Sequence, residues 1–172
     1  MTITGWVAKK YGDDVNTDYI IPAHLLQESW DKQFFADHAF ESFDPTFVRS
    51  LRAKESNVVV GGKNFGCGSS REQAVYAIKY NRVLAVIAES FPDIFFRNCL
   101  NNGLLPVQID DTSQISEGDK VEIDLDGRSL SNLSRNESYP IRATDSAIKQ
   151  MKEGGFLESV RERLRQKLKT SS

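Results

Sequence analysis

The stretch that decides the fold is Gly61–Tyr80, GGKNFGCGSSREQAVYAIKY, because strand-like runs flank it on both sides. Asn57–Val60 (NVVV) precedes it and Val83–Ala88 (VLAVIA) follows it. Each run is apolar on successive residues, which is typical of a strand covered on both faces. The second half of the stretch places apolar residues on one helical face: Ala74, Val75, Ala77 and Ile78. The pattern predicts a strand, a glycine loop, a helix and a strand, which is the unit of a parallel crossover.

The residues before this unit carry weaker patterns. Residues 1–26 mix turn formers with a short apolar step at Tyr19–Ile21 that stops at Pro22. We expect an irregular opening segment there, with one edge strand followed by a loop. Residues 27–54 are rich in aromatic side chains and predict short helices joined at Pro45.

The residues after the unit are easier to interpret. SFPDIFFRNCLNNG predicts a helix with Ser90 as its N-cap and Gly103 at its C-terminal end. A third strand, LLPVQI, follows directly. Apolar and polar residues then alternate around Asp126–Gly127, which predicts a β-hairpin.

The length of 172 residues fits one α/β domain spanning residues 1–172, with a helical tail over about residues 144–172. Gly154–Gly155 interrupts that tail. Its last part places apolar residues on one stripe: Leu157, Val160, Leu164 and Leu168. The five basic residues near its end favour a solvated helix face over an anionic partner.

Composition excludes several function classes. The chain has 22 Lys and Arg against 24 Asp and Glu, a net charge of -2, so it has no global field for nucleic acid or an anionic membrane. No apolar run approaches the roughly 20 residues that span a bilayer, and no secretion signal is visible, so we expect a cytoplasmic protein. Cys67 and Cys99 are expected to be thiols, and neither His24 nor His38 has metal-binding spacing, so no metal site is expected within this chain.

The glycine loop predicts an anion site. N–H groups at a helix start have no intrahelical partners, and glycines let an anion approach them, while Arg71 adds a fork of donors. The competing interpretation is a tight turn in which Ser69 or Ser70 is only an N-cap. Nucleotide motifs fit poorly, because Cys67 stands where a phosphate loop carries lysine and Arg71 where a dinucleotide loop carries a third glycine. A helix start would lower the pKa of the Cys67 thiol, but the sequence identifies no base for it.

Three ordered stretches carry a family resemblance: GDDVNTDYIIPAHLL, NFGCGSSREQAVYAIKY and VIAESFPDIFFRNCLNNGLLPV. Together they resemble the small subunits of 3-isopropylmalate dehydratase, in the aconitase superfamily, over roughly residues 5–127. The resemblance implies a single swivelling domain of β/β/α layers, similar to domain 4 of aconitase, that closes over an active site carried mainly by a large subunit. It also implies that the [4Fe–4S] cluster lies in the large subunit, so that no cofactor is bound by this chain alone.

Residue by residue, the resemblance gives Ser69 the role of the catalytic base, acting as an alkoxide on a malate-type substrate. Gly68, Ser70 and Arg71 match positions that bind a substrate carboxylate. Thr17 and Asp18 match a stretch that lines the same cleft, although Asp18 equally fits a turn-capping role. The resemblance gives the Cys67 thiol no catalytic duty, and we expect it to pack.

A specificity loop is expected after IIPA, at Leu25, Leu26, Gln27 and Glu28. Apolar leucines suit an isopropyl group, and Glu28 would repel a second distal carboxylate. Gln27 stands where relatives that accept such a carboxylate often carry arginine. The leading hypothesis is therefore the small subunit of a hydro-lyase that interconverts 2- and 3-isopropylmalate in leucine biosynthesis. Homoaconitate-like, citramalate-like or dimethylmalate-like substrates, a stand-alone carboxylate-binding module and, least favoured, a cysteine hydrolase remain as alternatives.

Overall fold

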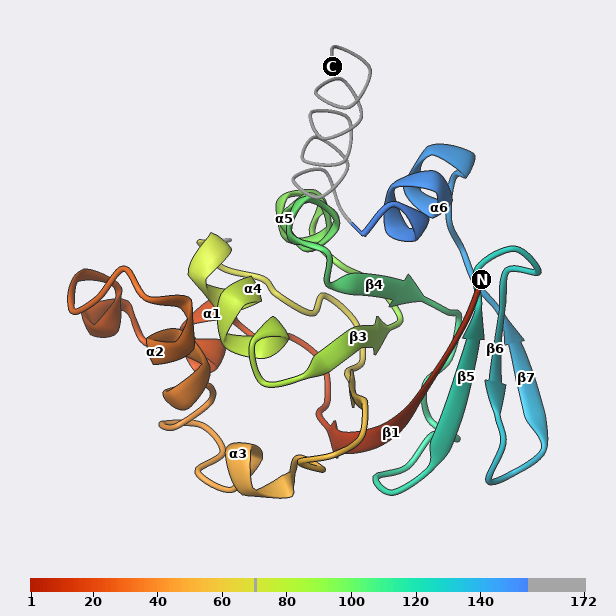
Figure 1. The fold of residues 1–172 in the computed structure, drawn as a ribbon, viewed down its shortest axis with the longest axis horizontal. Coiled ribbons are helices and arrows are strands. Elements are labelled where there is room, and N and C mark those ends of the chain that lie inside the picture. Colours follow the sequence, from red (N-terminus) through yellow and green to blue (C-terminus); the bar gives the residue numbers. More distant parts are fainter. Residues whose placement is uncertain (70, 155–172) are drawn as a thin grey trace, which may run out of the picture.

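A computed structural model describes residues 1–69 and 71–154. Its centre is a curled seven-stranded sheet in the order β4-β3-β2-β1-β5-β6-β7 (Figure 1). The first four strands of that order run parallel to one another: β1 (Thr2–Lys10), β2 (Asn57–Val60), β3 (Val83–Ala88) and β4 (Leu105–Gln108). The other three are antiparallel to their neighbours: β5 (Lys120–Asp124), β6 (Ser129–Asn132) and β7 (Glu137–Pro140). The mixed α/β class expected from the sequence is confirmed.

The helices are short. In chain order they are α1 (Thr17–Ile20), the 3₁₀ turn η1 (Ala23–Gln27), α2 (Lys32–Asp37), α3 (Phe47–Ser50), α4 (Glu72–Lys79), α5 (Asp93–Asn102) and α6 (Asp145–Lys152). The predicted crossover is confirmed, because α4 joins the parallel neighbours β2 and β3. Among the described residues, no helix is both long and apolar enough to cross a membrane.

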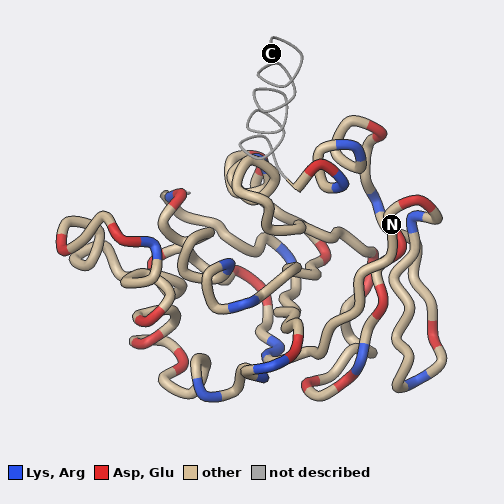
Figure 2. Tube along the Cα trace, in the orientation of Figure 1, with Lys and Arg blue, Asp and Glu red and all other residues tan. Residues whose placement is uncertain are grey.

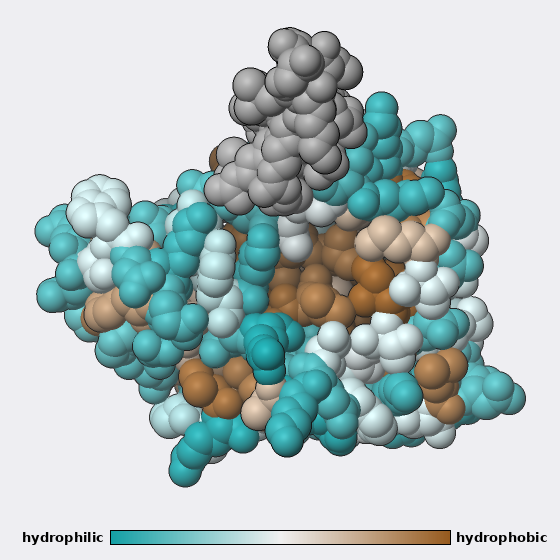
Figure 3. All heavy atoms as spheres, in the orientation of Figure 1, coloured by the Kyte–Doolittle hydropathy of each residue, from teal (hydrophilic) through white to brown (hydrophobic). Residues whose placement is uncertain are grey.

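The sheet is covered on both faces, which explains the apolar runs. Val59 and Val86 point into a first core with residues of α4 and α5. Val58, Val60 and Ile87 point into a second core with residues of β5, β6 and α6. Figure 3 shows apolar side chains of this second side in a hollow over β3 and β4. A run that alternates between two cores must be apolar at every position.

The expectation of an irregular opening segment is wrong for β1, which pairs with both β2 and β5 at the centre of the sheet. The two lysines at its end obscure the pattern of a central strand in the sequence. In the structure both side chains bond to residues of other segments. Lys9 forms an ion pair with Asp44 at 2.9 Å, and the Lys10 ammonium donates to the Ser113 carbonyl at 3.0 Å. Gly5 is needed for close approach, since a Cβ there would lie 2.7 Å from Val58 Cγ2.

Three local predictions are corrected. The expected edge strand at Tyr19–Ile21 is largely the short helix α1, which Asn16 caps by accepting from the amide of Asp18 at 2.9 Å. The helix α5 begins at Asp93, and the Ser90 hydroxyl accepts instead from the amide of Asn64 at 2.7 Å. The strand β7 was not expected. The apolar stripe expected at residues 157–168 lies outside the described residues.

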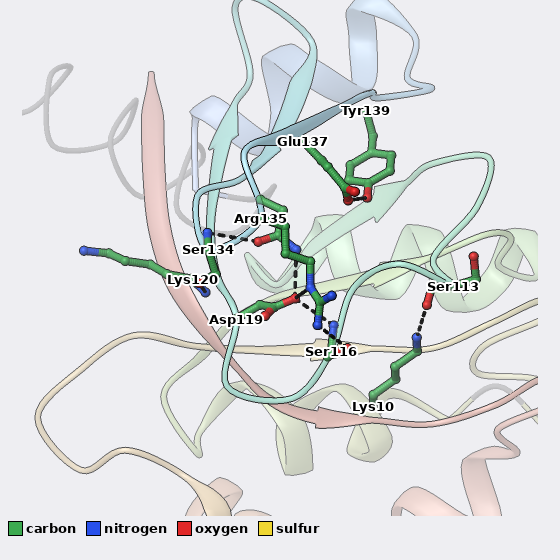
Figure 4. A network of polar contacts seen from close by, with 10 residues as sticks. Lys10, Ser113, Ser116, Asp119, Lys120, Ser134, Arg135, Glu137 and Tyr139 are labelled. Carbon is green, nitrogen blue, oxygen red and sulfur yellow. Dashed lines mark hydrogen bonds and ion pairs between the residues drawn. The ribbon is translucent and has the colours of Figure 1, made fainter.

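A polar network joins the β4–β5 connection to the turn between β6 and β7 (Figure 4). The carboxylate of Asp119 accepts from Arg135 Nε and from Asn132 Nδ2, each at 2.8 Å, and Arg135 also donates to Ser116 Oγ at 2.8 Å. Burial raises the pKa of Asp119, but the donors from Ser116, Asn132 and Arg135 outweigh it and lower that pKa. The network holds the antiparallel half of the sheet together at the end where its loops meet.

Candidate active-site loops

The strands β1 and β2 end side by side, because Lys10 pairs with Val60 in a parallel register. The loop that follows each strand therefore leaves from the same edge of the sheet. The carboxyl edge of parallel strands is where ligands bind in open α/β sheets. Residues 11–16 form the first loop and residues 61–71 the second, and both run directly into helices, α1 and α4.

The two loops are hydrogen-bonded to each other along their length. Three loop amides donate to a carbonyl of the other loop: Gly62 to Gly12 at 3.0 Å, Asp14 to Lys63 at 2.9 Å and Gly66 to Val15 at 2.8 Å. The amide of Thr17, the first residue of α1, donates to the Cys67 carbonyl at 2.8 Å. Two carboxylates add to these bonds. Asp13 accepts from the amide of Lys63 at 2.7 Å, and Asp14 accepts from Asn64 Nδ2 at 2.9 Å. The loops therefore form one unit.

Two glycines of the second loop are required by its conformation. Gly66 and Gly68 have φ of +86° and +93°, which side chains rarely adopt. A Cβ on Gly66 would lie 2.2 Å from the ring of Phe95, and one on Gly68 would lie 2.5 Å from Asn16 Oδ1. The second loop thus packs closely on α5 and on the cap of α1.

Ser69 lies at the end of this unit and is exposed. The N-cap position of α4 belongs to Arg71, whose side chain forms no cap hydrogen bond. The interpretation of Ser69 or Ser70 as the N-cap is therefore wrong. The amide of Ala74 donates to the Arg71 carbonyl at 3.1 Å, whereas the amides of the first two residues of a helix have no carbonyl of an earlier turn to bond to and are the groups that commonly bind anions. Ser70, the other predicted serine, lies outside the described residues.

Arg71 and the first residue of α1 supply polar atoms that have no hydrogen-bond partner among the described residues. Arg71 Nη1 lies 3.7 Å from Asp18 Oδ1, an ion-pair separation too long for a hydrogen bond. Arg71 Nη1 and the Thr17 hydroxyl are both buried, and neither has a hydrogen-bond partner among residues 1–69 and 71–154. Buried donors without partners are rare, and here they lie where the resemblance expects a substrate carboxylate.

The Cys67 thiol is not activated. The expectation that a helix start would lower its pKa is wrong, because burial and then the negative charge of Asp14 raise that pKa. Burial also raises the pKa of Cys99 well above its usual range. His38 contacts Glu41, with Nδ1 and Oε2 2.6 Å apart. A thiol held neutral is a poor nucleophile, which argues against the cysteine hydrolase alternative.

The predicted specificity loop divides into two parts. Leu25 is 8% exposed and belongs to the first core, and Leu26 packs partly against that core. Gln27 and Glu28 are exposed. The structure thus places Arg71 close to Asp18 and joins Thr17 to the loop that carries Ser69. It leaves Gln27 and Glu28 as the exposed members of the turn.

The donor set of this chain does not fit an iron–sulfur cluster. Within the described ranges, no group of three or more His, Cys, Asp or Glu side chains could hold a metal. The chain has only two cysteines, of which Cys99 is fully buried, whereas such clusters are held mainly by cysteine thiolates.

Sequence reasoning missed the residues that hold the loops together. Asp13 and Asp14 bond to the second loop, and Asn16 both caps α1 and contacts Gly68. The signal was the density of Asp and Asn in GDDVNTD, since these residues bond to nearby backbone amides. Nothing in the sequence indicated which backbone they would meet.

Comparisons with known proteins agree with this geometry. A family model described as the aconitase C-terminal domain matches residues 40–112. The small subunit of 3-isopropylmalate dehydratase from Brachyspira hyodysenteriae is 43% identical over 154 residues, which cover 88% of this chain and 93% of that protein. The methanogen homoaconitase small subunit of Methanocaldococcus jannaschii is 49% identical over 131 residues, covering 76% of this chain and 75% of that protein.

Among solved structures, a crystal structure of 3-isopropylmalate dehydratase from Methanocaldococcus jannaschii superposes with a TM-score of 0.87 at 39% identity. The match covers 99% of each chain. The sequence match and the fold match both extend well beyond the glycine loop. The chain belongs to the family of 3-isopropylmalate dehydratase small subunits, in the aconitase superfamily.

Proposed function

We propose that this chain is the small subunit of a hydro-lyase that interconverts 2-isopropylmalate and 3-isopropylmalate in leucine biosynthesis, and that it is active only with a large subunit that carries the [4Fe–4S] cluster. The observation that carries the proposal is the buried Arg71 Nη1, which has no hydrogen-bond partner among the described residues, at the N-cap of α4 and two positions after the exposed Ser69. The names of the relatives supply the substrate and the partner.

Arg71 and the start of α4 are proposed to bind a substrate carboxylate. The guanidinium presents a planar fork of donors that matches a carboxylate, and the first N–H groups of α4 add partial positive charge. Asp18 lies close enough to orient the guanidinium but at 3.7 Å does not use up its donors. A carboxylate that binds here would satisfy the buried Arg71 Nη1, which gives binding a definite energetic reason.

Ser69 is proposed to take the proton from the carbon next to that carboxylate. A serine hydroxyl is a weak base, so the alkoxide needs nearby positive charge. Arg71 and the helix start supply that charge, while the positive φ of Gly68 directs the chain toward the exposed position of Ser69. Departure of the substrate hydroxyl requires a Lewis acid, which the proposal assigns to the large subunit because the thiols of this chain do not fit a cluster.

A related substrate is the second candidate, because the homoaconitase small subunit is the relative with 49% identity. Two exposed residues bear on the choice. Gln27 carries no positive charge for an additional carboxylate, and Glu28 would repel one. We therefore expect isopropylmalate to be the better substrate and Gln27→Arg to shift the ratio of kcat/KM values toward homoaconitate.

The experiment is to purify the chain with the large subunit of the same organism and to reconstitute the cluster without oxygen. Isopropylmalate, homoaconitate, citramalate and dimethylmalate are then compared by kcat/KM. We expect the chain alone to be inactive and the complex to prefer isopropylmalate. Preference for another of these acids would replace the substrate, and tight carboxylate binding without any large subunit would favour a stand-alone binding module.

Arg71→Lys tests the carboxylate site in the same complex. A point charge replaces a fork of donors, so we expect KM to rise about tenfold or more while the complex still assembles. Arg97→Lys is the matched control, because Arg97 is an exposed arginine on α5 outside the two loops. An unchanged KM in Arg71→Lys would contradict the role given to Arg71.

A further inference from the structure

Residues 11–50 form an acidic lobe at one end of the molecule. The segment contains eight Asp and Glu against two Lys and Arg, a net charge of -6, whereas the whole chain has a net charge of -2. Figure 2 shows the acidic segments of this lobe at the left of the view. Seven of its carboxylate residues are exposed: Asp13, Asp14, Asp18, Glu28, Asp31, Asp37 and Glu41. The charge is therefore presented to the surroundings and is not confined to internal ion pairs.

The same lobe carries exposed apolar side chains. Trp30 is 95% exposed, and the rings of Tyr19 and Phe43 stack with centroids 4.7 Å apart while each remains about half exposed. Val48 on α3 is exposed as well. Trp30 has no ring contact or cation–π contact with another described residue. Tryptophan and tyrosine are the side chains that most often dominate binding at protein interfaces.

The exposed aromatic residues adjoin the proposed active site along the chain. Tyr19 follows Asp18, and Trp30 lies two residues after Glu28 of the specificity turn. In Figure 1 the helices α1 and α2 of the lobe lie on the same side of the sheet as α4. A partner that completes a site at Ser69 must therefore approach next to this lobe.

We propose that the acidic lobe is the surface on which the large subunit docks, through a basic face of that subunit with an apolar pocket for Trp30. This inference rests on the proposed function. The net charge of -6 of the lobe indicates which kind of partner binds there. Two copies of this chain that met through their lobes would bring two net charges of -6 together, which disfavours self-association there and favours a basic partner.

The test measures the dissociation constant of the complex by biolayer interferometry, with the large subunit immobilised and the full chain in solution. We expect Trp30→Ser and Phe43→Ser each to weaken binding about tenfold or more. Leu133→Ser is the matched control, because Leu133 is 48% exposed and lies outside the lobe, just after β6. The control should leave the dissociation constant within about twofold of wild type.

A charge test complements the apolar one. The double variant Asp37→Lys/Glu41→Lys should weaken binding about tenfold at low salt and flatten its salt dependence, because surface charges act mainly through screened long-range attraction. Glu122→Lys on β5 is the matched control and should change binding little. Urea midpoints of every variant are compared with wild type, so that loss of folding is separated from loss of binding.

The outcomes separate this inference from the proposed function. An active wild-type complex whose affinity is unchanged in Trp30→Ser, Phe43→Ser and the charge variant would overturn the inference and leave the function standing. A wild-type chain that forms no complex with the large subunit would overturn both. Self-association of the chain alone that Trp30→Ser abolishes would assign the surface to a second copy and overturn the inference as well.

Discussion

Gly68→Ala is expected to destabilise the chain by about 2 kcal/mol through two separable effects. The backbone at Gly68 has φ of +93°, which costs a residue with a Cβ roughly 1 kcal/mol. The three atoms nearest to that Cβ all belong to the amide of Asn16: Oδ1 at 2.5 Å and Cγ and Nδ2 at 2.9 Å. The amide must rotate away, and it then loses its bond to the backbone of Asp18, a cap that contributes about 1 kcal/mol.

The effects of Gly68→Ala and Asn16→Ala should not be additive. Asn16→Ala alone should cost about 1 kcal/mol, because it removes the same cap. The double variant should cost no more than Gly68→Ala, about 2 kcal/mol, because the cap can be lost only once. Additive effects would give about 3 kcal/mol, so the predicted coupling is about 1 kcal/mol.

Urea unfolding followed by far-UV circular dichroism measures these free energies. Gly118→Ala is the matched control: its φ is +85° and a Cβ there would have no atom within 4 Å. It should cost only the backbone effect, roughly 1 kcal/mol, and should be additive with Asn16→Ala. Full additivity of Gly68→Ala with Asn16→Ala would refute the contact between the two loops.

Two further predictions use the titration of buried groups. Burial and the charge of Asp14 raise the pKa of Cys67, so iodoacetamide should alkylate Cys67 more slowly at pH 7 than it alkylates a free cysteine. Asp14→Asn should accelerate the alkylation. Fast alkylation of Cys67 in the wild type would contradict this cause. Burial raises the pKa of Asp44, but hydrogen bonds from Thr46, Lys9 and Tyr11 outweigh it and lower that pKa to about 2. The folded pKa lies below the unfolded value of about 4, so this stabilisation is present above pH 4 and is lost as the pH falls toward 2. Between those pH values the free energy of unfolding of the wild type should fall by about 1–2 kcal/mol more than that of Asp44→Asn. Urea midpoints measured against pH give both values, and equal losses would contradict the role of Asp44.

The crossover at the centre of the fold could be predicted because its signals are local. β2 and β3 face two cores, so they are apolar at every position, and the helix between them has one apolar face. β1 could not be predicted in the same way. Its place depends on pairing with β2 and β5, more than 40 residues away in the sequence, and its two lysines bond to residues that the local pattern cannot reveal.

The candidate site residues Ser69, Arg71, Thr17 and Asp18 followed from the family resemblance. Of these, the structure places Arg71 Nη1 3.7 Å from Asp18 Oδ1. The bonds from Asp13 and Asn16 could not be predicted, because their partners belong to a loop about 50 residues later in the chain. The direction of the Cys67 pKa was predicted wrongly because the helix start is a local feature, whereas burial is a property of the whole fold.

The most direct test of the central claim compares wild type with Ser69→Ala in the reconstituted complex. We expect kcat to fall by about 10²-fold or more, because a general base contributes that much, while the affinity for the large subunit stays unchanged. The dissociation constant for isopropylmalate should change little, because Arg71 and the start of α4 remain. Full activity of Ser69→Ala in an assembled, cluster-loaded complex would contradict the claim that this chain supplies the base.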